Sequence, residues 1–120
     1  MKLSVIIPCL NAARTIGAQL DALSRQAWNE AWEVIVADNG STDETMEVIQ
    51  KHSGGLPSVE VVDASDRAGS AHARNVGALL ARGESIVFCD ADDEVGTGWL
   101  AAIGAALGEH GFVASRVEVV

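Results

Sequence analysis

Residues 85–93 read SIVFCDADD, an apolar run followed at once by three aspartates. The run is typical of a buried strand over Ser85–Cys89. In an extended segment alternate side chains share a face, so Asp90 and Asp92 can converge on one cation while Asp93 points elsewhere. Oxygen ligands of this kind favour Mg²⁺, Mn²⁺ or Ca²⁺ over Zn²⁺. Taken alone, however, an Asp-rich segment after a strand is more often a solvated turn.

Three similar apolar runs come earlier in the chain and predict three more strands. They are Leu3–Ile7, which Pro8 closes, Glu33–Asp38 and Ser58–Asp63. The end of the sequence, Phe112–Val120, is also strand-like.

Segments with apolar residues at three- and four-residue steps separate these strands and predict helices. The apolar positions are Ile16, Leu20, Leu23 and Ala27 in the first helix, Met46 and Ile49 in the second, Ala73, Val76 and Leu80 in the third, and Leu100, Ile103 and Leu107 in the last. Asn11 is predicted to cap the first helix. Ser41–Glu44 matches a capping box for the second, with the Ser41 hydroxyl serving the Glu44 amide. Gly83 is predicted to end the third helix in a left-handed conformation.

Strand and helix thus alternate four times with short links, which indicates a mainly parallel sheet covered by helices. We expect an α/β fold, a three-layer α/β/α sandwich. The length of 120 residues and the absence of a Pro/Gly-rich linker predict a single domain over residues 1–120.

Composition excludes several classes of function. The chain is 48% hydrophobic and 21% charged, as expected of a globular protein. Its net charge of −9, with only eight basic residues, argues against nucleic-acid binding. No apolar run approaches the roughly 20 residues of a membrane helix, and Met1–Leu3 leads into a strand without a signal-peptide pattern, so we expect a cytoplasmic location. Cys9 and Cys89 have no disulfide or metal spacing and are predicted to be buried free thiols.

Polar groups follow each predicted strand. They are Pro8–Asn11, Asp38–Ser41, Asp66–Arg67 and Asp90–Asp93. Because the carboxyl ends of parallel strands meet at one edge of a sheet, where ligands bind in open α/β folds, we expect these groups to form one site. Carboxylates there can bind both a metal ion and the hydroxyl and ring N–H donors of a nucleoside.

Four ordered segments resemble a family 2 glycosyltransferase. They are Val5–Pro8 with Asn11, Val36–Asp43, Ala73–Gly77, and Gly83–Phe88 with the aspartates behind it. The resemblance covers essentially the whole chain. It implies a GT-A fold that binds a nucleotide-diphospho-sugar, with a UDP-sugar as the expected donor, and a divalent cation, Mn²⁺ or Mg²⁺.

The resemblance also implies roles for the charged residues. The family's Asp-X-Asp motif maps to Asp90 and Asp92, with Asp92 as metal ligand and Asp90 binding ribose or metal. Asp93 is a secondary candidate. The guanidinium of Arg74 would meet the nucleotide or its phosphates, although a surface arginine paired with a neighbouring acid is the alternative.

The nucleoside would be bound by four further residues. By resemblance, Asp38 accepts a hydrogen bond from the base, Asp66 helps to bind the base, Pro8 ends the strand where the nucleoside packs, and Asn11 contacts the ligand. Each also has a purely structural alternative: a turn cap for Asp38, a solvated loop acid for Asp66, a strand terminator for Pro8 and a helix cap for Asn11.

The chain departs from the family pattern in two places. Leu10 stands where many relatives have an aromatic residue that could stack on a base. Family members also continue beyond this length with the acceptor site and the catalytic base, so no catalytic residue is assigned, and we expect the chain to be truncated before the acceptor half. The tail Phe112–Val120 is then expected to leave an apolar edge that homo-oligomer formation would cover.

Three functions were weighed against these features. The leading hypothesis is the donor domain of an inverting glycosyltransferase. The alternative is a non-catalytic module that binds a nucleotide-sugar and a metal. A sugar-phosphate nucleotidyltransferase is disfavoured, because Pro8–Arg14 contains no glycine for a phosphate-binding loop.

Overall fold

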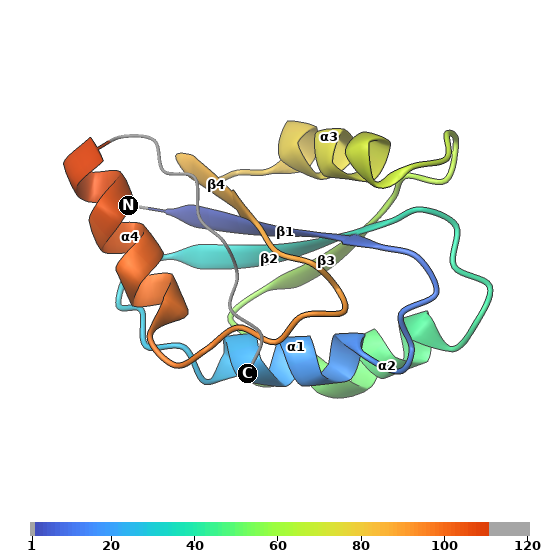
Figure 1. The fold of residues 1–120 in the computed structure, drawn as a ribbon, viewed down its shortest axis with the longest axis horizontal. Coiled ribbons are helices and arrows are strands. Elements are labelled where there is room, and N and C mark those ends of the chain that lie inside the picture. Colours follow the sequence, from blue (N-terminus) through green and yellow to red (C-terminus); the bar gives the residue numbers. More distant parts are fainter. Residues whose placement is uncertain (1, 111–120) are drawn as a thin grey trace.

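The computed structural model describes residues 2–110, in which strands and helices alternate as predicted (Figure 1). The elements are β1 (Leu3–Cys9), α1 (Ile16–Ser24), β2 (Trp32–Asp38), α2 (Thr45–His52), β3 (Val59–Asp63), α3 (Ser70–Leu80), β4 (Ser85–Phe88) and α4 (Trp99–His110). The strands form one parallel sheet in the order β3-β2-β1-β4. The predicted α/β class is therefore confirmed. The predicted tail strand, Phe112–Val120, lies outside the described residues.

Helices cover both faces of the sheet, which gives the three predicted layers. Helices α1 and α2 lie on one face and α3 on the other, while α4 stands beside the amino ends of the strands (Figure 1). The larger core lies on the α1 side and includes Leu3, Val5, Ile7, Ile16, Leu20, Leu23, Val34, Val36, Leu100, Ile103 and Leu107. The smaller core lies under α3 and includes Ile6, Ile35, Ala37, Val62 and Ala73. Met46, predicted to face inward, is instead 37% exposed.

Strand β1 continues through Pro8 to Cys9 and is longer than predicted. Proline lacks an N–H, so it is normally excluded from a central strand. Here the carbonyl of Cys9 faces β2 and accepts the Asn39 amide, whereas the carbonyl of Ile6 faces β4 and accepts the Cys89 amide. The nitrogen of Pro8 points to the same side as the carbonyl of Ile6, towards β4. The pairing of β1 with β4 ends at Ile6, so no residue of β4 lacks a hydrogen-bond donor because of the proline.

Two of the predicted helix caps are wrong. Helix α1 begins at Ile16, and Asn11 instead adopts a left-handed φ of 50° and binds the β2–α2 loop. Ser41 does not cap α2, because its hydroxyl donates to Asp38 Oδ1 at 2.6 Å. The amide of Thr45 is capped by Asp43 Oδ1 at 3.0 Å. Asn11 is drawn to a loop 31 residues away, whereas at α2 the competing partners are local, Asp38 for the Ser41 hydroxyl and Asp43 for the Thr45 amide.

Gly83 also differs from its prediction, since its φ is not positive. A side chain there would place Cβ 2.6 Å from Ser4 Oγ and 2.8 Å from the Ser4 amide nitrogen. The residue is therefore small because the chain entering β4 passes close against β1. Helix α3 ends earlier, at Leu80, where Ala81 becomes extended.

A buried polar cluster holds that connection in place. Glu33 is 3% exposed, and its Oε2 accepts hydrogen bonds from Ser4 Oγ at 2.6 Å and from the Arg82 amide at 2.7 Å. Ser4 Oγ in turn accepts the Gly83 amide at 2.8 Å. Burial opposes the charged form, but these hydrogen bonds prevail and hold the pKa of Glu33 below its usual value. The cluster thereby ties the α3–β4 link to β1 and β2.

Other sequence predictions can be compared directly. Cys9 and Cys89 are buried free thiols, as predicted. Burial raises the pKa of Cys9 to about 11 and also raises the pKa of Cys89, so neither is a reactive thiolate. Among the described residues, none of the helices combines the length and hydropathy that a membrane crossing requires.

The buried Glu33 carboxylate should make stability depend on pH. Replacing Glu33 with Gln is expected to lower the free energy of unfolding at pH 7 by about 1.5–3 kcal/mol, the range for hydrogen bonds to charged groups. Because the folded pKa is below the unfolded value of about 4.3, this difference is fully present above pH 4.3 and shrinks as the pH falls through the folded pKa. Denaturant titrations of both proteins between pH 7 and pH 3 measure it.

Glu60→Gln provides the matched control. Glu60 contacts the same arginine, with Arg82 Nη1 to Glu60 Oε2 at 3.2 Å, but at the exposed surface. Its loss should change stability by less than about 1 kcal/mol. Equal effects of the two substitutions, or a Glu33→Gln difference that grows at low pH, would contradict this account.

Candidate functional site

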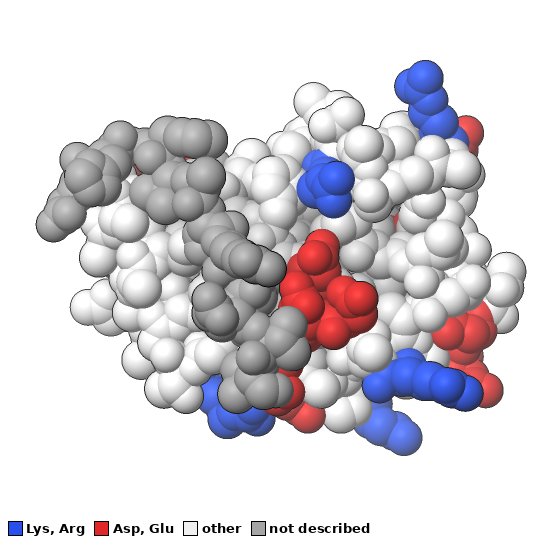
Figure 2. Space-filling view, in the orientation of Figure 1, with Lys and Arg blue, Asp and Glu red and all other residues white. Residues whose placement is uncertain are grey.

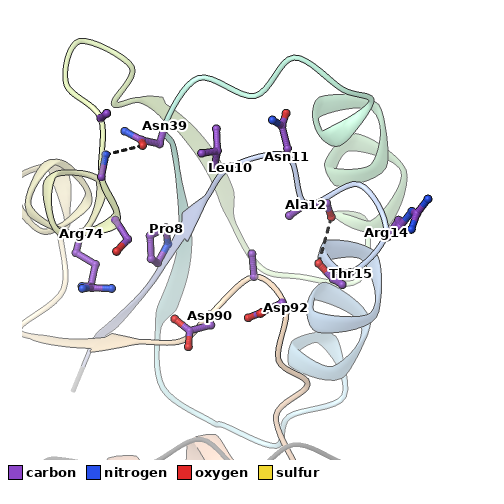
Figure 3. A pocket seen from close by; sticks show the side chains of 14 residues that line it. Pro8, Leu10, Asn11, Ala12, Arg14, Thr15, Asn39, Arg74, Asp90 and Asp92 are labelled. Atoms are coloured by element: carbon purple, nitrogen blue, oxygen red, sulfur yellow. Dashed lines mark hydrogen bonds between the residues drawn. The ribbon is translucent and has the colours of Figure 1, made fainter.

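A cavity of about 730 Å³ opens at the carboxyl edge of the sheet, where the sequence predicted the site (Figure 3). Its walls come from segments far apart in the sequence. They are the end of β1 and the β1–α1 loop (Pro8, Leu10, Asn11, Ala12, Arg14 and Thr15), Asn39 after β2, the end of the β3–α3 loop with the first turns of α3 (Ala68, Gly69, Ser70 and Arg74) and Asp90–Asp92 after β4. The parallel register brings all these segments to one edge.

Three carboxylates gather at one side of this cavity, two of them, Asp90 and Asp92, in its lining. Asp90, Asp92 and Asp93 each place one oxygen so that the three oxygens lie within 4.8 Å of one another. They form a compact acidic patch on the surface (Figure 2). Burial, with the negative charges of Asp90 and Asp92, raises the pKa of Asp93. Such a group of hard oxygen donors, mutually repelling and open to solvent, fits a divalent cation.

A side chain of α1 holds the backbone of this acidic loop from the side of the protein core. Gln19 on α1 is fully buried, and its Nε2 donates to the Asp90 carbonyl at 2.9 Å while its Oε1 accepts the Val95 amide at 3.0 Å. Ala91 and Val95 are 8% and 3% exposed and pack into the larger core. The sequence analysis did not identify Gln19. Its position in the Ile16–Leu23 apolar stripe of α1 was the available signal.

Arg74 projects from α3 into the cavity near Asp90 (Figure 3). The side chain is half-buried, and the structure gives it no ion pair or hydrogen bond within the described part of the chain. The predicted alternative, an arginine paired with a neighbouring acid, is therefore not observed. The guanidinium is a cation available to a ligand.

Asn39 fixes the part of the cavity wall that the β3–α3 loop forms. Its Nδ2 donates to the carbonyls of Ala64 and Arg67, both at 2.8 Å, and its Oδ1 accepts the Gly69 amide at 2.9 Å. One amide thereby holds the β3–α3 loop that enters the cavity at residues 68–70. The sequence analysis included Asn39 within the polar group Asp38–Ser41 but gave it no role of its own.

Asn11 joins two loops rather than capping a helix. Its Oδ1 accepts the amides of Thr42 at 2.8 Å and Asp43 at 3.3 Å, and its own amide donates to Ser41 Oγ at 2.9 Å. Leu10 beside it is 54% exposed at the cavity. None of the residues that line the described cavity is aromatic, so an aromatic stacking platform is absent there.

Two predicted nucleotide-binding acids lie outside the cavity lining. Asp38 Oδ1 accepts the Ser41 hydroxyl at 2.6 Å, which matches the turn-capping alternative. Asp66 Oδ1 lies 2.7 Å from His72 Nε2 at the exposed surface, and this hydrogen bond lowers the pKa of Asp66. The structure thus brings together Pro8, Asn11, Arg74, Asp90 and Asp92, and places Asp38 and Asp66 beyond the walls.

The sequence matches the family model "Glycosyl transferase family 2" over residues 4–119. Among curated relatives, it is 39% identical over 94 residues to the uncharacterized glycosyltransferase YibD of Escherichia coli, covering 78% of this chain and 27% of that protein. It is 35% identical over 108 residues to a PGL/p-HBAD biosynthesis glycosyltransferase of Mycobacterium tuberculosis, covering 89% and 42%. The chain therefore spans less than half the length of these relatives.

Solved structures agree with the sequence comparison. Staphylococcus aureus TarS, a poly(ribitol-phosphate) β-N-acetylglucosaminyltransferase, superposes with a TM-score of 0.79 at 32% identity in its complex with UDP-GlcNAc. That match covers 92% of this chain and 32% of the TarS chain. The mannosyltransferase PcManGT of Pyrobaculum calidifontis, in complex with GDP-Man and Mn²⁺, gives a TM-score of 0.71 at 33% identity over 78% of this chain and 28% of its own.

The family match covers nearly all of the chain, and both the fold and the relatives agree with it. The chain belongs to glycosyl transferase family 2, as the sequence motifs indicated, and it has the GT-A-type α/β fold of that family.

Proposed function

We propose that this chain is the donor domain of a glycosyltransferase, and that its cavity binds a nucleotide-diphospho-sugar together with Mn²⁺ or Mg²⁺. The observation that carries the proposal is the placement on the walls of one cavity of two acids of the acidic cluster, Asp90 and Asp92, and of Arg74, which has no ion-pair or hydrogen-bond partner among residues 2–110. The complexes of TarS with UDP-GlcNAc and of PcManGT with GDP-Man and Mn²⁺ support it by homology.

Asp92 and Asp90 would hold the cation, with Asp93 as a further donor. A cation there relieves the repulsion among the three carboxylates, and this favours metal binding even before a nucleotide binds. When bound, the ion supplies Lewis-acid stabilisation to the diphosphate leaving group. The three acids would then be occupied with metal binding, so none of them is assigned as the base that deprotonates an acceptor.

Arg74 would bind the phosphates. The chain carries a net charge of −9, so an anionic ligand needs local positive charge to approach the cavity. The five N–H donors of its guanidinium bond no other residue in the described part of the chain, and they can form charge-assisted hydrogen bonds to phosphate oxygens. Arg74 and the cation would flank the diphosphate from two sides.

The nucleoside would occupy the end of the cavity formed by Pro8, Leu10 and residues 68–70, with Asn11 at its rim. A UDP-sugar is the proposed donor. Asp66, whose side chain is 78% exposed, would turn from His72 to reach the base. Asp38 would have to share its carboxylate between Ser41 and the base.

We further propose that the complete enzyme transfers the sugar with inversion. A non-catalytic binding module would share every binding property above. Only sugar transfer separates them, and transfer to any acceptor by this chain would exclude the module.

The metal dependence of donor binding tests the proposal. A UDP-sugar at about a hundred times its dissociation constant should stabilise the protein by roughly 2.7 kcal/mol in the presence of Mn²⁺. Asp92→Asn should weaken Mn²⁺-dependent donor binding at least tenfold. Without ligands the variant should be no less stable than the wild type, because one repelling charge is lost. Thermal shift and calorimetry with UDP-GlcNAc and GDP-mannose, with and without Mn²⁺, measure these effects.

Asp63→Asn is the matched control, because Asp63 ends β3 outside the cavity lining and accepts the Ser65 amide, which asparagine can also accept. It should leave donor binding unchanged. The proposal fails if no nucleotide-sugar stabilises the wild type with Mn²⁺, or if Asp92→Asn binds like the wild type.

Arg74 gives a prediction with a different signature. Arg74→Gln should weaken nucleotide binding by tenfold or more, as expected for the loss of a charge-assisted hydrogen bond. Mn²⁺ alone should bind at least as tightly as to the wild type, because a nearby positive charge is removed. Calorimetric titrations with UDP and with Mn²⁺ separately measure both. Lys51→Gln, in the exposed last turn of α2 and outside the cavity lining, should change neither, and a parallel loss of Mn²⁺ affinity in Arg74→Gln would contradict the assignment.

A further inference from the structure

The buried side-chain amide of Gln19 bonds the backbone of the acidic loop at both ends. Gln19 has no exposed surface, and both polar atoms of its side chain are used by this loop. Its Nε2 donates to the carbonyl of Asp90 and its Oε1 accepts the amide of Val95. One side chain on α1 therefore bonds both ends of the segment that carries the three carboxylates.

The carbonyl that Gln19 binds also closes the acidic turn. Asp90 O accepts the Asp93 amide at 3.4 Å in addition to Gln19 Nε2 at 2.9 Å. Without a cation, repulsion among Asp90, Asp92 and Asp93 favours opening of this turn. Breaking the Gln19 bonds would leave an unsatisfied amide in the core, so the buried side chain opposes that opening.

A second glutamine offers a built-in comparison. Gln26 lies just beyond α1, and its Nε2 donates to the carbonyls of Ala22 at 3.1 Å and Gly96 at 3.0 Å. Its Oε1 accepts the Leu100 amide at 3.0 Å. Gln26 thus anchors the segment that follows the acidic loop and the start of α4, and bonds none of the three aspartates or their backbone.

We infer that Gln19 is a positioning residue of the cation site. It holds the Asp90–Val95 backbone so that the three carboxylate oxygens converge before the ion arrives. The inference rests on the proposed function, since it assigns Gln19 to the metal site proposed above. The role is one of preorganisation: the amide does not touch the ion, and its loss raises the free energy of bringing the carboxylates together.

The test compares Gln19→Met with Gln26→Met. Methionine fills similar volume and removes all side-chain hydrogen bonds, so both variants should lose thermal stability. Gln19→Met should bind Mn²⁺ about tenfold more weakly, the lower end of the range for residues that support metal ligands. Gln26→Met should bind Mn²⁺ as the wild type does. Calorimetric titration of each protein with MnCl₂, without nucleotide, gives the affinities.

Gln19→Asn keeps a buried amide but is one methylene too short to reach both Asp90 and Val95. It should fold and show the same loss of Mn²⁺ affinity, which covers the case in which Gln19→Met does not fold. Unchanged Mn²⁺ affinity in the Gln19 variants, or an equal loss in Gln26→Met, would overturn the inference while the metal site stands. Failure of the wild type to bind Mn²⁺ would overturn the metal site and the inference with it.

Discussion

The parallel register of β1 with both of its neighbours is the constraint on which the rest of the structure depends. Leu3 pairs with Trp32 on one side and with Ser85 on the other, and Cys9 pairs with Asp38. Because the three strands run in step, the loops that follow them leave the sheet at one edge. Shifting a strand by one residue would reverse its faces, so burial of the two cores fixes this register. The position of the cavity follows from it.

Side-chain amides then shape what the register brings together. Asn11 joins the loops after β1 and β2, Asn39 holds the loop before α3, and Gln19 holds the loop after β4. Loops lack the backbone ladders of strands and helices, so their polar groups need other partners. An amide that both donates and accepts can satisfy two backbone groups at once. These uncharged side chains hold the loops around the cavity in which the charged residues converge.

The sequence was sufficient for the fold and for much of the cavity. Apolar periodicity predicted the strands and helices, and the rule that ligands bind at the carboxyl edge placed Pro8, Asn11, Asp90 and Asp92 together. Arg74 was predicted only from the family resemblance. It failed where a partner is distant in sequence. Asn11 was assigned to the nearest helix, whereas its partners lie 31 and 32 residues away. The partners of Gln19 lie 71 and 76 residues away, which local motifs do not reveal. Self-association and the cytoplasmic location stay predictions.

The central claim is that the acidic cluster and Arg74 bind one ligand from two sides. A crystal structure of the protein with Mn²⁺ and a UDP-sugar, with anomalous data collected for manganese, tests this most directly. We expect the manganese peak at Asp92, with the diphosphate between the ion and the Arg74 guanidinium. Manganese bound away from Asp90–Asp93, or a nucleotide that leaves Arg74 without a contact, would contradict the account.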